Sequence, residues 1–218
     1  MKPVKLVTLF DVDNTLLNND RVTRDLRRHL RRSFGSASEK RYFEIFEKLR
    51  SELGYADYLG TLQRYRLEVP HDPYLLCMST YLINYPFADR LYPGALDVIR
   101  NRRKQGPVVI LSDGDAVFQP HKVIKSGLWK AVGGNVLIFI HKENMLAEVE
   151  RLYPARRYVM VDDKLRILEA MKKVWKDRLT TVFVRQGHYA LDRRLTKRYA
   201  PADVTVSRIG LFGRYKDR

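Results

Sequence analysis

Short apolar segments, rich in residues that favour β-strands, recur along this sequence and constrain its fold more than any other feature. They occupy residues 6–10, 108–111, 136–140, 158–161 and 180–184, with residues 204–206 as a candidate for a short sixth. Amphipathic patterns typical of helices lie between them, over residues 93–105, 118–126, 143–152 and 165–175. Strands that alternate with helices indicate βαβ units. We therefore predict an α/β fold with a Rossmann-like, mostly parallel sheet that is buried on both faces.

Residues 18–89 interrupt this alternation, because they contain no clear strand. Amphipathic patterns there predict helices over residues 22–34, 39–53, 57–65 and 73–81. We interpret this segment as a helical insert between the first and second strands. The predicted domains are thus an α/β core of residues 1–17 and 90–218 and an inserted helical unit of residues 18–89.

Charge is the unusual part of the composition. The chain of 218 residues holds 41 Lys and Arg against 25 Asp and Glu, a net charge of +16. Such a surplus favours anionic partners: nucleic acid, an acidic membrane surface or phosphorylated substrates. The single cysteine, Cys77, excludes a disulfide within the chain and favours a reducing compartment. Since no apolar stretch approaches the length of about 18–20 residues that spans a membrane, we expect a cytoplasmic protein without membrane contact.

Polar residues capable of chemistry follow each of the first four predicted strands. Taken singly, each has an ordinary explanation as a turn residue, a helix cap or a solvated charge. Together they fall at the carboxyl edge of one parallel sheet, where ligands bind in open α/β folds. In chain order they are Asp11 with Asp13, then Ser112, then Lys142, then Asp162 with Asp163.

Carboxylates that converge at one sheet edge repel one another and persist as anions only if a cation holds them. Oxygen ligands favour a hard cation, and Mg²⁺ is the cofactor we expect. Carboxylates, a metal, a lysine and a hydroxyl suit a substrate with a phosphoryl group. Lys142 would neutralise charge on that group, and Ser112 would hydrogen-bond its oxygens.

Residues 10–16, with the sequence Phe-Asp-Val-Asp-Asn-Thr-Leu, resemble the D-x-D-x-T motif of the haloacid dehalogenase (HAD) superfamily. Ser112, Lys142 and the pair Asp162-Asp163 match its other motifs in order. Lys142 lies 20 residues before Asp162, which is a spacing typical of the superfamily. The resemblance covers about residues 6–206. It implies a HAD-type α/β core, and it identifies the helical insert of residues 18–89 as similar to a C1-type cap.

The resemblance also implies residue roles. Asp11 would be the nucleophile and a metal ligand, and Asp13 would be the general acid and base, with its carbonyl on the metal. Thr15 would support their loop. Lys142 would bridge Asp11 and the phosphoryl group, with Lys122 as a rival for that role. The phosphoryl group would be held by Ser112 and by backbone amides around Asp113 and Gly114. Asp163 is our first choice for the metal carboxylate, followed by Asp162.

Asp13 bears on the reaction class, because dehalogenating members of the superfamily lack a carboxylate at that position. A halide leaves without a proton, whereas an alkoxide needs one. The sequence thus predicts a Mg²⁺-dependent phosphatase that hydrolyses a small phosphorylated metabolite through an aspartyl-phosphate intermediate. A phosphomutase is an alternative. A nucleic-acid-binding protein is an alternative from another class, although the basic residues are scattered and form no recognised motif.

Residues 58–66 loosely resemble the cap segment of pyrimidine 5′-nucleotidase-like members, which makes nucleotide hydrolysis a further alternative. On that reading Arg64 or Arg66 would meet an anionic leaving group, and Tyr65 would stack on a base. A solvated helix face explains the same residues. His188 and Tyr189, after the fifth strand, either approach the mouth of the site or cap the following segment.

Overall fold

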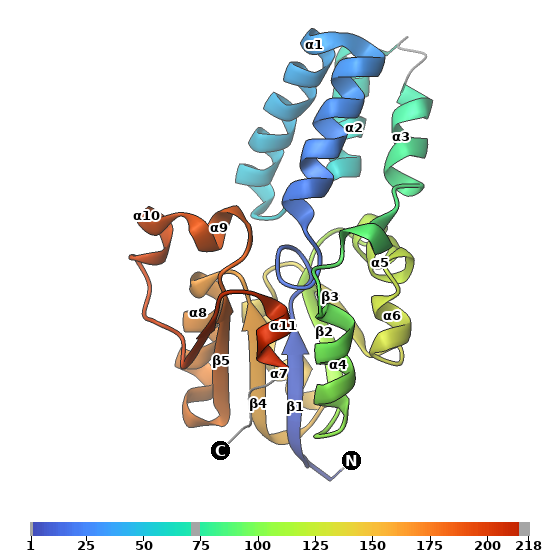
Figure 1. Ribbon diagram of the computed structural model, residues 1–218. Coiled ribbons are helices and arrows are strands. Elements are labelled where there is room, and N and C mark those ends of the chain that lie inside the picture. Colours follow the sequence, from blue (N-terminus) through green and yellow to red (C-terminus); the bar gives the residue numbers. More distant parts are fainter. Residues whose placement is uncertain (1, 71–74, 214–218) are drawn as a thin grey trace.

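A computed structural model describes residues 2–70 and 75–213 (Figure 1). Its centre is a six-stranded sheet in the order β3-β2-β1-β4-β5-β6, in which every strand pair is parallel. The predicted fold class, an α/β core with a mostly parallel sheet, is confirmed. The strands are β1 (Val4–Phe10), β2 (Val108–Asp113), β3 (Val136–Phe139), β4 (Ala155–Asp162), β5 (Leu179–Val184) and β6 (Val204–Val206).

Burial on both faces explains why the strands read as continuous apolar runs. Side chains alternate across a strand, so Leu9 joins one hydrophobic cluster and its neighbour Phe10 joins the other. The cluster around Leu9 packs under α7 (Leu146–Leu152) and α8 (Leu165–Trp175). The cluster around Phe10 packs under α4 (Ala95–Arg103) and α11 (Ile209–Phe212). Figure 1 shows these two helices beside β1.

The helices between the later strands depart slightly from the predicted ranges. Residues 143–152 split at Met145 into a 3₁₀ turn, η2 (Lys142–Asn144), and α7. His141, with a left-handed φ of 59°, precedes the turn. The remaining elements are α5 (Phe118–Lys125), α6 (Leu128–Ala131), η3 (Lys176–Arg178), α9 (Gly187–Leu191) and α10 (Arg193–Thr196).

Helices follow β1 directly and stand over the carboxyl ends of the strands in Figure 1. They are α1 (Asn19–Leu53), α2 (Tyr58–Glu68), α3 (Leu75–Ile83) and the 3₁₀ turn η1 (Phe87–Arg90). Helix α1 consists of two helical segments, because Gly35 interrupts it with a non-helical backbone of φ 86° and ψ 168°. Residues 73 and 74, where the last predicted helix of the insert begins, lie outside the described residues. Among the helices of the described ranges, none has the length and apolarity needed to span a membrane.

Candidate active site

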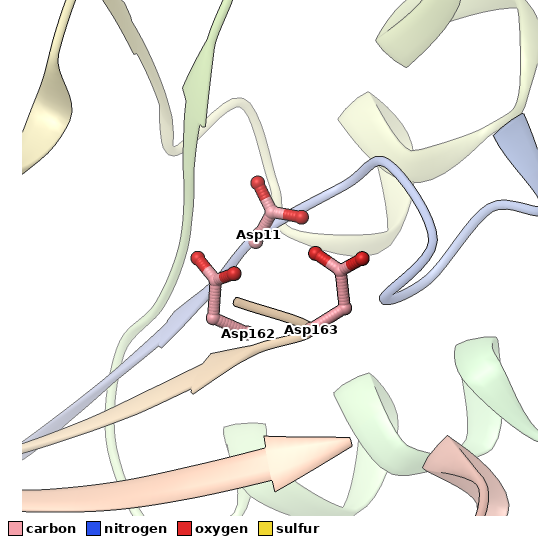
Figure 2. Close-up of side chains that lie close together, drawn as sticks. All are labelled: Asp11, Asp162 and Asp163. Carbon is pink, nitrogen blue, oxygen red and sulfur yellow. The ribbon is translucent and has the colours of Figure 1, made fainter. Parts of the chain in front are cut away.

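Asp11 and Asp162 reach the site from two neighbouring strands, β1 and β4. Phe10 of β1 pairs with Val161 of β4, so Asp11 and Asp162 leave the sheet side by side. This is the point where the strand order reverses direction, the usual ligand-binding edge of such sheets. Asp11, Asp162 and Asp163 are all buried, and each offers a carboxylate oxygen within 4.8 Å of the others (Figure 2).

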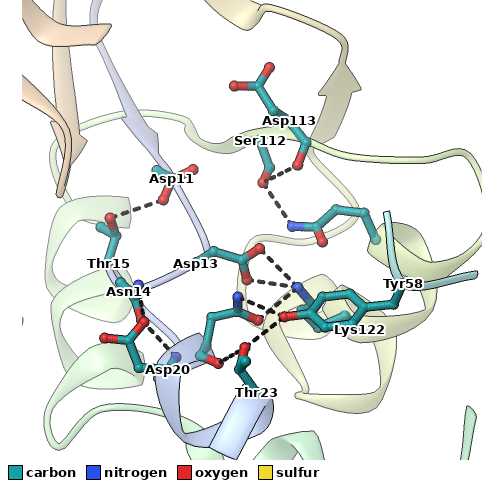
Figure 3. Close-up of polar contacts among 12 residues, drawn as sticks. Asp11, Asp13, Asn14, Thr15, Asp20, Thr23, Tyr58, Ser112, Asp113 and Lys122 are labelled. Atoms are coloured by element: carbon teal, nitrogen blue, oxygen red, sulfur yellow. Dashed lines mark hydrogen bonds and ion pairs between the residues drawn. The ribbon is translucent and has the colours of Figure 1, made fainter. Parts of the chain in front are cut away.

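Lys142 bridges two of these acids. Its Nζ lies 2.6 Å from Oδ1 of Asp11 and 2.7 Å from Oδ2 of Asp162. Burial lowers the pKa of Lys142, but the carboxylates of Asp11 and Asp162 raise it more, so the side chain stays charged. The second oxygen of Asp11 accepts a hydrogen bond of 3.0 Å from the Thr15 hydroxyl (Figure 3). Asp11 is therefore fixed by one charged and one neutral donor.

Asp163 is the acid whose oxygens have no partner in contact among the described residues, and Lys164 is the cation that acts on it most strongly through its charge. Both of its carboxylate oxygens are buried and have no hydrogen-bond partner in the part of the chain that the structure describes. Burial holds the pKa of Asp163 well above its usual range, and the negative charges of Asp162 and Asp11 add to this rise, although the positive charge of Lys164 lowers that pKa. Burial likewise raises the pKa of Asp162 to about 6, in spite of Lys142.

A hard divalent cation fits this environment, because it would satisfy the orphaned oxygens of Asp163 and relieve the repulsion among the acids. Asp11, Asp163 and Asp162 are the residues that would hold it. Asp13 is predicted to bind the metal through its backbone carbonyl. Its side chain is not part of this cluster of carboxylates.

Asp13 belongs to a second ion pair. Nζ of Lys122 lies 2.8 and 2.9 Å from the two oxygens of Asp13, as Figure 3 shows. Lys122 is therefore not the lysine that reaches Asp11. The two lysines considered from the sequence serve different acids of the same motif.

The predicted phosphoryl-binding residues lie at the end of β2 and just beyond it. Ser112 is buried, and its hydroxyl accepts a hydrogen bond of 2.9 Å from Gln119. The Asp113 carboxylate accepts from the backbone amide of Lys142 at 2.7 Å, which fixes the start of η2 beside β2. The amide of Gly114 donates to the carbonyl of Phe139 at 3.1 Å, so in this structure it is already occupied.

A cavity of about 670 Å³ opens above these residues. Its floor includes Asp11, Asp13, Ser112 and Asp113, and its upper wall comes from α1, α2 and the loop between them. The aromatic and basic residues that line it are Arg24, Phe46, Arg50, Tyr55, Tyr58, Tyr92, Lys164, Arg166, His188 and Tyr189. His188 and Tyr189 thus lie at the cavity, one of the two placements that the sequence left open.

Arg64 lies outside this cavity. Its guanidinium is 2.7 Å from Glu52 in an ion pair at the surface, and Arg64 is not among the residues that line the cavity. Tyr65, one position along the same helix, is buried in the hydrophobic cluster that also includes Phe10 of the sheet. The structure therefore does not bring Arg64 together with the acids and Lys142.

Polar residues around the first motif were missed by the sequence reasoning. Asp20 accepts from the Asn14 side chain at 2.9 Å and from Nδ1 of His188 at 2.6 Å. Gln186 donates to the carbonyl of Thr15 at 3.2 Å. Asp20 and Asn14 are separated by a loop, whereas His188 and Gln186 lie most of the chain away from their partners. Neither the positions of the strand ends nor helical periodicity indicates such contacts. Asn14 is the one residue whose type pointed to its local backbone, because asparagine adopts a left-handed conformation more readily than most residues. Its φ in the structure is 61°.

Comparisons with known proteins agree with this architecture. Residues 7–174 match the family of haloacid dehalogenase-like hydrolases. The chain belongs to that family. A crystal structure of a haloacid dehalogenase-like hydrolase from Burkholderia xenovorans LB400 shares 63% sequence identity with a TM-score of 0.95, over 99% of this chain and 100% of the other.

More distant structures share the fold. The L-2-haloacid dehalogenase of Xanthobacter autotrophicus, with chloropropionic acid covalently bound, is 18% identical with a TM-score of 0.61 over 97% of both chains. The HAD-hydrolase YfnB of Bacillus subtilis, bound to magnesium, is 16% identical with a TM-score of 0.61 over 97% of this chain and 98% of the other. A search of curated proteins found no match.

Proposed function

We propose that this HAD-like hydrolase is a Mg²⁺-dependent phosphatase that acts on a small phosphorylated metabolite. The observation that carries the proposal is Asp13, which lines the same cavity as Asp11 and follows it by two residues. An alkoxide leaving group needs a proton from such a carboxyl group, whereas a halide does not. Asp13 therefore favours phosphate esters over haloacids as substrates.

The proposed reaction has two steps on Asp11. Its carboxylate attacks phosphorus, the bond from phosphorus to the leaving oxygen breaks, and Asp13 donates a proton to that oxygen. Water then attacks the phosphorus of the aspartyl phosphate, Asp13 accepts a proton from the water, and the bond to Asp11 breaks to release phosphate. The general acid of the first step is thus the general base of the second.

Other residues would prepare the phosphoryl group for attack. Lys142, already on Asp11, would donate to a phosphoryl oxygen, and the Ser112 hydroxyl would donate to another. When bound to Asp11 and Asp163, Mg²⁺ would neutralise part of the phosphoryl charge. The insert of residues 18–89 would act as a cap, since α1 and α2 contribute the upper wall of the cavity and can exclude water from it.

The first prediction tests the nucleophile. Asp11→Asn should abolish hydrolysis of phosphate esters in a panel of sugar phosphates and nucleoside monophosphates, with the fold retained by circular dichroism. EDTA should remove the activity of the wild-type protein, and added Mg²⁺ should restore it. The replacement of Asp97, an exposed acid on α4, by Asn serves as the control and should leave the rate unchanged.

Three outcomes would contradict the proposal. Activity of Asp11→Asn within tenfold of wild type would exclude Asp11 as the nucleophile. Turnover that survives EDTA would exclude the metal requirement. Chloride release from 2-chloropropionate, with no phosphate released from any ester, would assign the protein to dehalogenation instead.

A further inference from the structure

Lys122 is buried in the core beside the active-site cavity, yet neither step of the proposed reaction uses it. Its side chain is 1% exposed, and its Nζ binds both oxygens of Asp13 at 2.8 and 2.9 Å. A charged, two-point contact of this kind fixes both the position and the rotation of a carboxylate. The orientation of Asp13 toward the cavity therefore depends on Lys122.

The same ammonium group is joined to the helical insert. Nζ of Lys122 donates to the Asn19 side chain at 3.3 Å, and Asn19 in turn donates to the hydroxyl of Tyr58 at 3.3 Å. The Tyr58 hydroxyl also lies 2.8 Å from the hydroxyl of Thr23 (Figure 3). Asn19 and Thr23 come from α1, Tyr58 from α2 and Lys122 from α5, so the insert and the core meet at this ammonium.

Aromatic rings close the remaining side of Lys122. Its Nζ is 5.6 Å from the centroid of the Phe118 ring, and that ring lies 5.3 Å from the ring of Tyr58. Phe118 and Tyr58 are both buried. Because a buried ammonium is costly without partners, its hydrogen bonds are committed to Asp13 and Asn19.

We propose that Lys122 is a positioning residue that sets where Asp13 delivers and receives its proton, and that Asn19 and Tyr58 link this position to the cap. The inference rests on the proposed phosphatase function. In the first step the proton passes from Asp13 to the leaving oxygen as the bond to phosphorus breaks. Lys122 keeps its own protons throughout, and it acts on the reaction only through Asp13.

The test compares leaving groups that differ in their need for a proton. kcat/KM reports transfer of the phosphoryl group to Asp11, so it isolates the first step. For Lys122→Met, we expect kcat/KM for an alkyl phosphate to fall by about 10²-fold, within the range of general acid catalysis. For 2,4-dinitrophenyl phosphate, whose leaving group departs without a proton, it should fall by less than about threefold. Lys125→Met, on the exposed side of α5, is the matched control and should behave as wild type.

A double-mutant cycle separates positioning from a general structural effect. If Lys122 acts through Asp13, Lys122→Met should add no further loss in an Asp13→Asn background. Tyr58→Phe keeps the ring and removes only the hydroxyl. It should lower kcat/KM for the alkyl phosphate by a smaller factor, again with little effect on 2,4-dinitrophenyl phosphate. That variant also tests the proposal if Lys122→Met fails to fold.

The outcomes distinguish the two proposals. Equal losses on both esters, no loss on either, or a full additional loss in the Asp13→Asn background would overturn the role of Lys122 and leave the phosphatase function standing. If the wild-type protein hydrolyses none of the esters, the proposed function itself fails.

Discussion

Three buried acids at one site differ in what neutralises them. Asp11 and Asp162 share the ammonium of Lys142, at 2.6 and 2.7 Å. The carboxylate of Asp163 has no such partner among the residues that the structure describes. A buried carboxylate whose oxygens lack hydrogen-bond and ion-pair partners destabilises the folded protein. The protein without metal therefore carries an energetic penalty at Asp163 that a cation would remove.

This difference gives a prediction for Asp163→Asn. Without divalent metal, the variant should be more stable than wild type by about 1–3 kcal/mol, because an amide costs less than a charge to bury. Mg²⁺ should raise the melting temperature of the wild-type protein and have little effect on the variant. Thermal melts at several Mg²⁺ concentrations measure both effects.

The control for that experiment is Asp177→Asn, because Asp177 is an exposed acid next to α8. It should respond to Mg²⁺ as wild type does. A Mg²⁺-dependent stabilisation of Asp163→Asn equal to that of wild type would show that Asp163 does not hold the metal.

At the scale of helices and strands, apolar patterns predicted the architecture well. Every predicted strand is present, and the break between the first two predicted helices of the insert coincides with Gly35. A strand that is buried on both faces has apolar residues at consecutive positions, and this pattern is easy to recognise in the sequence. Parallel pairing then gathers the polar residues at the strand ends, which is why the structure brings Asp11, Lys142 and Asp163 together from such distant positions.

Contacts that depend on helix rotation or on a long side chain were not predictable in this way. Lys122 lies ten residues after Ser112 on a helix, and only the packing of α5 directs its ammonium to Asp13 rather than Asp11. Arg64 faces away from the cavity for the same reason, since periodicity identifies the apolar face of α2 without fixing which polar face meets the site. Tertiary packing decides both cases.

The junction between the insert and the core contains a buried carboxylate, Asp25 of α1. It accepts from the Tyr85 hydroxyl at 2.7 Å and lies 3.1 Å from the guanidinium of Arg90 on η1. Burial raises the pKa of Asp25, but the hydrogen bond from Tyr85 and the charges of Arg21 and Arg90 outweigh it and leave that pKa below its usual value of 3.8. The ionised form is therefore the one that stabilises this junction.

Asp25→Asn should lower the free energy of unfolding at pH 7 by about 1–3 kcal/mol, because it leaves the donors of Arg90 and Tyr85 poorly matched. The folded-state pKa is depressed, so the stabilisation from ionised Asp25 is complete above the unfolded value near 3.8 and is lost as pH falls through the folded value. The gap between wild type and variant should therefore narrow below pH ~4 in urea unfolding curves.

The exposed pair of Asp97 and Arg100 provides the comparison for Asp25, since both side chains are largely solvated. Asp97→Asn should change stability by less than about 0.5 kcal/mol at any pH in that range. A gap for Asp25→Asn that stays constant from pH 7 to ~3 would contradict the assigned role of its charge.

For the whole molecule, the net charge of +16 acts at a distance from the chemistry. The cluster of Asp11, Asp162 and Asp163 is acidic. The basic residues that line the cavity above it are Arg24, Arg50, Lys164 and Arg166, of which Arg50 and Arg166 form ion pairs with glutamates. We expect the net positive charge of the whole molecule to concentrate anionic substrates near it and to raise their association rate. The charge surplus thus fits the delivery of a phosphorylated substrate.

Salt should weaken that delivery. We expect kcat/KM for a dianionic phosphate ester to fall as the Debye length shrinks from about 10 Å at 0.1 M to about 3 Å at 1 M salt, with kcat nearly unchanged. Phosphocholine, whose cationic group offsets part of the phosphate charge, should lose less. A kcat/KM that is insensitive to salt for both esters would show that the surface charge has another purpose.

The support of the first motif comes from the far end of the chain. Gln186 donates to the carbonyl of Thr15 at 3.2 Å and accepts from the amide of Ile209 at 2.7 Å, although the family match ends at residue 174. During synthesis, Asp11 and Asp13 leave the ribosome well before Gln186 and Ile209. Their loop receives this support only after the ribosome has translated past residue 209, so a growing chain contains these two acids long before it can fix their loop.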